Sequence, residues 1–230
     1  WVLRMKKEVI LFDINETVLN LGSLQPKFKA VFGSEDALSL WFSKLLHSST
    51  VCIATNVKST FSELANAALD AIAQRYKCDL TTESKGALLT SFANLPPHTD
   101  IKESLHKLRK SGFKTVAFSN SSLDLITSQI KNSGLEDYFD TVISVEETGS
   151  FKPNSDVYKF AAETLQEPVD NLRLVATHDW DTHGALSAGL QAAYIDRTGV
   201  EYHSLYLKPE ISSKTMDGVV EQVIKHNLDK

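Results

Sequence analysis

Residues 9–20 read VILFDINETVLN, and the junction inside this stretch decides the fold that we expect. Residues 9–12 form a continuous apolar run, which is typical of a strand buried on both faces of a parallel sheet. An acid, Asp13, follows the run at once, and a second acid, Glu16, stands three residues later. Asp13 is therefore either a helix cap or surface acid, or a group placed where parallel sheets bind ligands.

The composition is that of an ordinary globular protein, with 230 residues, 42% of them hydrophobic, and a net charge of −5. A mildly acidic balance without blocks of like charge argues against nucleic-acid or membrane-surface binding. No apolar run is long enough to span a bilayer or resembles a secretory signal, so we expect a cytoplasmic protein that acts on a small molecule. Cys52 and Cys78 fit no metal or redox spacing and are expected to be reduced. Met5 is expected to be the natural start of the chain.

Strands and helices alternate after residue 96. Helical patterns cover residues 101–112, 123–134, 155–166 and 181–189, and strand-like runs cover residues 113–119, 139–145, 172–178 and 191–196. Repeated βα units predict an α/β fold with a doubly wound parallel sheet. Before them, residues 24–92 carry apolar residues at helical spacing, and two prolines end that block. We therefore predict a Rossmann-like core, residues 1–20 and 96–230, and an inserted α-helical cap, residues 21–95.

Polar residues stand at the ends of four of the predicted strands. In chain order they are Asp13, then Ser119 and Asn120, then Thr177, His178 and Asp179, then Asp196. A loop lysine, Lys152, falls between the second and third groups. Because the carboxyl ends of parallel strands meet at one edge of the sheet, we expect these groups to form one site. Taken singly, Ser119 and Asn120 could be turn residues and Lys152 a solvated charge.

These residues resemble the motifs of the haloacid dehalogenase superfamily. The four motifs read FDINET with Asp13, FSNSS with Ser119, FKPNSDVY with Lys152 and THDWDTHGA with Asp181. Within the superfamily the chain is most similar to the type II L-2-haloacid dehalogenases, through its Ser-Asn pair and its WDTHGA segment. Tyr158 and Thr17 fall where those enzymes have a tyrosine and a threonine, although Tyr158 could equally be a core residue and Thr17 a helix cap.

The resemblance implies a hydrolase that removes halide from small L-2-haloacids. Asp13 would be the nucleophile that forms a covalent ester, and Lys152 would keep it ionised and oriented. Ser119 and Asn120 would donate hydrogen bonds to the substrate carboxylate, and Asn120 also to the departing halide. Asp181 is the acid of the fourth motif that the chain retains.

Asn15 separates this chemistry from that of the superfamily's phosphatases. Those enzymes have a second aspartate here, which protonates the leaving alcohol, and they need Mg²⁺. Their other metal-binding acid would align with Thr177, which cannot replace a carboxylate ligand. We therefore expect no cofactor, although Asp13 with a backbone carbonyl leaves a weak Mg²⁺ site open. A Mg²⁺-dependent phosphatase is the alternative function, and a catalytically silent binding protein is a third, which the retained nucleophile and lysine disfavour.

Two departures from the dehalogenase pattern indicate how the ester would be hydrolysed. His178 stands where those enzymes have an asparagine, and Glu16 where they have a glycine. A lone histidine is more often structural than catalytic, yet a neutral imidazole suits the activation of water, and a carboxylate would orient it. We predict His178 as the general base and Glu16 as its partner, and we expect the rival base His183 to point away.

The predicted cap lacks one residue of the dehalogenases, an arginine that follows a tryptophan and helps the halide to leave. Here Phe42 follows Trp41. We expect Trp41, Phe42 and Trp180 to form apolar walls around the substrate, although such a stripe is more often core. Dimers are common among these enzymes, and a homodimer is left open because no exposed stripe decides it.

Overall fold

The computed structural model describes residues 7–228, so Met5 and the other residues of 1–6 in the predicted core lie outside it. The strands are β1 (Val9–Phe12), β2 (Lys114–Ser119), β3 (Thr141–Ser144), β4 (Leu172–Ala176), β5 (Gln191–Ile195) and β6 (Ile211–Ser213). They form a six-stranded sheet in the order β3-β2-β1-β4-β5-β6, and every pair of neighbours is parallel. The predicted doubly wound α/β fold is confirmed.

β1 lies in the middle of the sheet, which explains its uninterrupted apolar run. Leu11 pairs with Val116 of β2 on one side and with Leu174 of β4 on the other. Each residue of β1 is buried, because helices cover both faces of the sheet. The backbone N–H of Asp13 still donates to the carbonyl of Val175, at 3.0 Å, so the first residue after β1 is held at the edge of the sheet.

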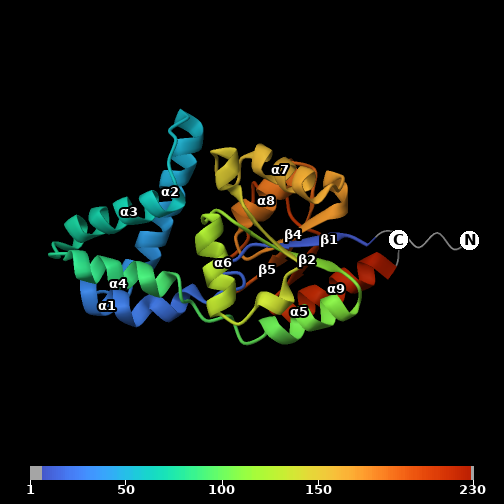
Figure 1. Ribbon diagram of the computed structural model, residues 1–230, viewed down its shortest axis with the longest axis horizontal. Helices are drawn as coiled ribbons and strands as arrows, with labels where there is room; N and C mark the ends of the chain where they lie inside the picture. Colours follow the sequence, from blue (N-terminus) through green and yellow to red (C-terminus); the bar gives the residue numbers. More distant parts are fainter. Residues whose placement is uncertain (1–6, 229–230) are drawn as a thin grey trace, which may run out of the picture.

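Helices cover the two faces of the sheet (Figure 1). They are α5 (Ile101–Lys110), α6 (Leu123–Asn132), α7 (Ser155–Leu165), α8 (Asp179–Ser187) and α9 (Met216–Leu228). α7 and α8 lie on one face, and α5 and α9 pack together on the other. Short 3-10 turns lie at Leu21–Leu24, Glu136–Tyr138, Val145–Thr148 and Val169–Asn171. No element was predicted after residue 196, so β6 and α9 were missed; β6 has only three residues, too few for a periodic pattern.

Four helices form a separate body beside the sheet (Figure 1), and all of them lie within residues 21–95, the predicted cap. They are α1 (Gln25–Phe32), α2 (Ala37–Thr55), α3 (Phe61–Tyr76) and α4 (Thr82–Phe92). The chain leaves the core after Asn20 and returns at Pro96, and these two crossings lie side by side because Asn20 N–H donates to the Pro96 carbonyl at 2.8 Å. Leu19 and Pro97 form an antiparallel bridge next to that bond. Within residues 7–228, no helix has the length and apolar character that crossing a membrane requires.

Candidate active site

Asp13 lies at the carboxyl end of β1, is 5% exposed, and receives hydrogen bonds from three side chains. Its Oδ1 accepts from Lys152 Nζ at 2.8 Å. Its Oδ2 accepts from Thr17 Oγ1 at 2.8 Å and lies 3.1 Å from His178 Nδ1. The structure thus brings the predicted nucleophile together with three residues that the sequence analysis named.

Lys152 comes from the loop before α7 and is 1% exposed. Its ammonium also donates to Asp181 Oδ2 at 2.6 Å, so it lies between two buried carboxylates. Its backbone N–H donates to Asn120 Oδ1 at 2.9 Å, and this bond ties the loop after β2 to the lysine. Asn120 therefore has a structural role here, and its predicted contact with a substrate stays a prediction.

Tyr158 of α7 and Asp181 of α8 complete the buried chain of polar groups. The Tyr158 hydroxyl donates to Asp181 Oδ1 at 2.6 Å. Burial raises the pKa of Asp181, and the neighbouring Lys152 charge opposes that rise. Burial and the Asp181 carboxylate raise the pKa of Tyr158 well above its usual value, so the phenol stays neutral and keeps its hydrogen. Tyr158 is therefore a buried residue whose hydroxyl group contacts the site.

Two further predicted residues fix the loops around the nucleophile. Thr17 Oγ1 also accepts from the backbone N–H of Thr177 at 2.9 Å, which joins the loops after β1 and β4. Ser119 is buried at the end of β2, and its Oγ accepts from Ser121 N–H at 3.1 Å. Its predicted contact with a substrate carboxylate likewise stays a prediction.

His178, which follows β4, lies between two carboxylates. Its Nδ1 faces Asp13, and its Nε2 lies 2.7 Å from Glu16 Oε2. The ring stacks on Trp180, with centroids 5.2 Å apart, and also packs against Phe42 of α2. The structure therefore brings His178 and Glu16 together, 162 positions apart in the chain.

The charges in this cluster differ from the sequence-based expectation at one residue. Burial alone would lower the pKa of His178, but the hydrogen bonds and charges of Asp13 and Glu16 raise it to about 10. The expectation of a neutral imidazole is therefore wrong for this state, in which His178 is a cation with both N–H groups on carboxylates. Burial alone would raise the pKa of Asp13, but Lys152 and His178 lower it well below its usual range. Asp13 is thus ionised at neutral pH.

Asn15 faces a polar network behind the nucleophile. Its Nδ2 donates to Ser121 Oγ at 3.3 Å, and its Oδ1 accepts from Gln129 Nε2 at 3.1 Å. Gln129 is buried on α6 and also donates to the carbonyl of Phe92, at the end of α4. Asn15 therefore links the loop after β1 to the cap crossing. Gln129 was missed, because a single amide on a buried helix face carries no local signal.

The donors around Asp13 do not fit a resident Mg²⁺ ion. Both Asp13 oxygens accept hydrogen bonds, and two of the three partners, Lys152 and His178, are cations. Asp181 is held by Lys152 as well. A divalent cation at this carboxylate would therefore meet two positive charges in place of the acidic ligands that it prefers. In the described part of the chain, no three His, Cys, Asp or Glu side chains gather as a metal site would require.

Two clefts separate α2 of the cap from the core, and Ser43 and Leu46 line both. One, of about 430 Å³, is lined by Glu16, Phe42 and His178. Its other walls come from residues in the first part of the cap. The other, of about 460 Å³, is lined in addition by Lys152, Trp180 and Tyr206, among others. Phe42 lines the first cleft and Trp180 the second, and their predicted contact with a substrate stays a prediction.

The position of Trp41 does not support its predicted place in that wall. Its indole is 1% exposed and lies inside the cap, with ring centroids 5.3 Å from Phe28 and 5.5 Å from Phe92. Its Nε1–H donates to the carbonyl of Ala65 at 3.0 Å. Trp41 is a core residue of the cap.

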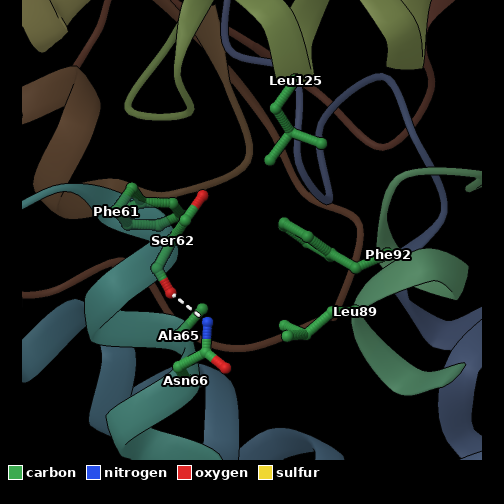
Figure 2. Close-up of a pocket in the computed structure, with 7 residues that line it drawn as sticks. All are labelled: Phe61, Ser62, Ala65, Asn66, Leu89, Phe92 and Leu125. Atoms are coloured by element: carbon green, nitrogen blue, oxygen red, sulfur yellow. Dashed lines mark hydrogen bonds between the residues drawn. The ribbon is translucent and has the colours of Figure 1, made fainter. Parts of the chain in front are cut away.

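A smaller pocket of about 180 Å³ lies between the cap and α6 (Figure 2). Its lining residues are Phe61, Ser62, Ala65, Asn66, Leu89, Phe92 and Leu125. The Asn66 side chain is tied to its own helix by a hydrogen bond to the Ser62 carbonyl. This lining contains none of the charged residues around Asp13, so the pocket offers no reactive group.

Two polar residues named from the sequence lie outside the site. His183 points away from Asp13, as expected: its Nδ1 accepts from Leu207 N–H, and its ring stacks on Tyr206 at 4.6 Å. Asp196 accepts from Gly199 N–H at 2.6 Å within its own loop. The fourth polar strand end therefore shapes a loop and does not join the cluster at Asp13.

The chain belongs to the haloacid dehalogenase-like hydrolase family, whose model matches residues 7–176. It is 27% identical to the haloacetate dehalogenase H-2 of Moraxella sp. (strain B), over 95% of this chain and 99% of that protein. It is 26% identical to the (S)-2-haloacid dehalogenase of Pseudomonas sp. (strain YL), over 92% of each chain. Among solved structures, the L-2-haloacid dehalogenase from Xanthobacter autotrophicus has a TM-score of 0.88 at 20% identity, covering 95% of this chain and 98% of that one. The predicted resemblance is confirmed.

Proposed function

We propose that the protein hydrolyses small L-2-haloacids to 2-hydroxyacids through a covalent ester on Asp13. One observation carries the proposal: Asp13 is a buried, ionised carboxylate between two cations, with an amide at Asn15 in place of a proton-donating acid. The names of the relatives, (S)-2-haloacid and L-2-haloacid dehalogenases, support the same chemistry.

In the first step an Asp13 oxygen attacks C2 of the haloacid from the side opposite the halogen. A C–O bond forms, C2 inverts, and the carbon–halogen bond breaks with its electron pair leaving on the halide. A halide needs no proton, which agrees with Asn15. Lys152 and His178 offset the charges of the substrate and the halide, which matters because the residue after Trp41 on α2 is the uncharged Phe42.

Ester formation then changes His178. Esterified Asp13 carries no charge, so His178 loses one of its two anionic partners and its pKa falls. While Glu16 still holds the Nε2 hydrogen, Nδ1 releases its proton to water in the adjoining cleft. The neutral imidazole becomes available only when there is an ester to hydrolyse.

In the second step the Nδ1 of His178 accepts a proton from a water that attacks the Asp13 carbonyl carbon. The bond between that carbon and the ester oxygen breaks, and the 2-hydroxyacid leaves with the remaining proton of the attacking water. The Asp13 carboxylate and the His178 cation are restored. The cycle converts haloacid and water into hydroxyacid, halide and one proton.

The first experiment measures halide release from the two enantiomers of 2-chloropropionate, alongside phosphate release from small phosphate esters. Each assay is run with Mg²⁺ and with EDTA. We expect halide release from the L-enantiomer, unchanged by EDTA and abolished in Asp13→Asn. Metal-dependent phosphate release without halide release would replace this proposal with the phosphatase alternative.

The second experiment tests the pair of His178 and Glu16. His178→Ala should release about one halide per site and then stop, with the bound propionyl group detected as a mass increment on the intact protein. His183→Ala is the matched control, because this histidine stacks on Tyr206 away from Asp13, and it should turn over normally. Normal steady-state turnover in His178→Ala would remove His178 from the mechanism.

A further inference from the structure

The backbone of Glu16 is left-handed, with φ at 70°. Among the described residues, the other non-glycine residues with positive φ are Asn56, Lys77 and Gln166, and each closes a helix, where this conformation is common. Glu16 lies in the loop after β1 and closes no helix. Glycine adopts this conformation at least strain, so a glutamate at this position keeps its carboxylate at a cost in backbone strain.

Groups from outside the loop hold three successive carbonyls at this turn. The Glu16 carbonyl accepts from His98 Nε2 at 2.9 Å, and the Thr17 carbonyl accepts from Arg197 at 3.1 Å. The Val18 carbonyl accepts from the backbone N–H of His98 at 3.0 Å. His98 therefore forms two hydrogen bonds to the turn, one through its backbone N–H and one through its ring.

The hydrogen on the His98 ring can be assigned from its partner. A carbonyl oxygen only accepts, so Nε2 must carry the hydrogen. Burial and the nearby Arg197 charge lower the pKa of His98, so the ring is neutral at physiological pH and the bond does not depend on protonation. Arg197 is itself held by Asp100, at 2.8 Å, which makes the support rigid.

We propose that His98 is a positioning residue, which holds the Glu16 peptide in the left-handed conformation from which its carboxylate reaches His178 Nε2. The inference rests on the proposed roles of Glu16 and His178 in ester hydrolysis. Without the ring N–H, the Glu16 peptide relaxes to a right-handed or extended conformation, and its carboxylate turns away from His178. Ester hydrolysis then slows, whereas ester formation by Asp13 and Lys152 does not.

A pair of amide variants tests the proposal. In His98→Gln the amide nitrogen extends as far as Nε2 and can still donate to the Glu16 carbonyl. In His98→Asn it extends only as far as Nδ1 and cannot. We expect ester hydrolysis about 10- to 100-fold slower in His98→Asn, with an unchanged halide burst, and near-normal turnover in His98→Gln. His106→Asn, at an exposed position of α5, is the control.

A second background separates positioning from general damage. The Glu16→Gly variant has no carboxylate at residue 16, and glycine adopts the left-handed conformation without strain. Adding His98→Asn to this variant should therefore not slow ester hydrolysis any further. Equal rates in His98→Asn and His98→Gln, slowing of both chemical steps, or a further loss in the Glu16→Gly background would overturn the role of His98. Normal turnover in Glu16→Gly, which has no acceptor for His178 Nε2, would instead remove Glu16 from the proposed mechanism, and with it the reason for positioning it.

Discussion

Replacing Lys152 with methionine removes the only side chain that bridges Asp13 and Asp181 among the described residues. Both carboxylates are buried, at 5% and 0% exposure, and Lys152 donates to each at 2.8 and 2.6 Å. Breaking a buried ion pair by removing one partner costs about 3–5 kcal/mol, because the remaining charge is left uncompensated. We expect the free energy of unfolding to fall by that amount at pH 8, and we expect halide release to be lost.

The loss should depend on pH in a defined direction. Without the lysine, one of the two carboxyls takes up a proton on folding, so its folded pKa lies above its unfolded value. Stability then falls as pH rises toward the folded pKa, by about 1.4 kcal/mol per pH unit for one proton. The free energy of unfolding of the variant should therefore fall less, relative to the parent protein, at pH 5 than at pH 8.

Urea unfolding at the two pH values measures this loss. Lys159→Met, an exposed lysine on α7, is the control and should change stability by less than about 0.5 kcal/mol. Lys152→Met combined with Asp181→Asn should recover part of the loss. A loss below about 1 kcal/mol, or one that is equal at pH 5 and pH 8, would refute the account of a buried, lysine-compensated pair.

Three further outcomes are expected. Thr17→Val removes a donor to Asp13, so the halide burst should slow and the free energy of unfolding should fall by about 1–3 kcal/mol, as stopped-flow and urea titration would report. Gly184→Ala places a methyl 2.6 Å from Pro153 Cβ, so thermal unfolding should show a loss of about 1–3 kcal/mol, and a variant as stable as the parent would contradict the close packing. The pairing of His178 stabilises the fold fully below pH 6.5 and is lost as pH rises through about 10, so the stability difference from His178→Ala should shrink over that interval.

The sequence predicted the residues of the site better than their charges. Asp13 follows from an apolar strand that ends on an acid, because parallel sheets bind ligands at that edge, and Lys152 and Asp181 follow from the resemblance to the family's motifs. The charge of His178 depends on two carboxylates at 3.1 and 2.7 Å, and no pattern along the chain encodes such distances. The same holds for Gln129 and His98, which reach the loop after β1 from segments distant in sequence.

The two aromatic residues of α2 show a second limit. Trp41 and Phe42 are neighbours in the sequence, but successive residues on a helix point about 100° apart. One is therefore directed into the cap and the other toward His178. Only the packing of α2 against the other cap helices decides which residue faces the site.

The hydrogen-bonded crossing of Asn20 and Pro96 has a consequence for how such a protein can diverge. The two ends of the cap leave the core side by side as a paired ribbon. The core therefore tolerates the cap as an insertion at one surface position, in the way that it would tolerate a long loop. Asp13, Lys152 and His178 lie on core loops, whereas much of the wall around the clefts comes from the cap. Exchange or redesign of residues 21–95 should therefore change which molecules enter the clefts while Asp13, Lys152 and His178 keep their arrangement in the core.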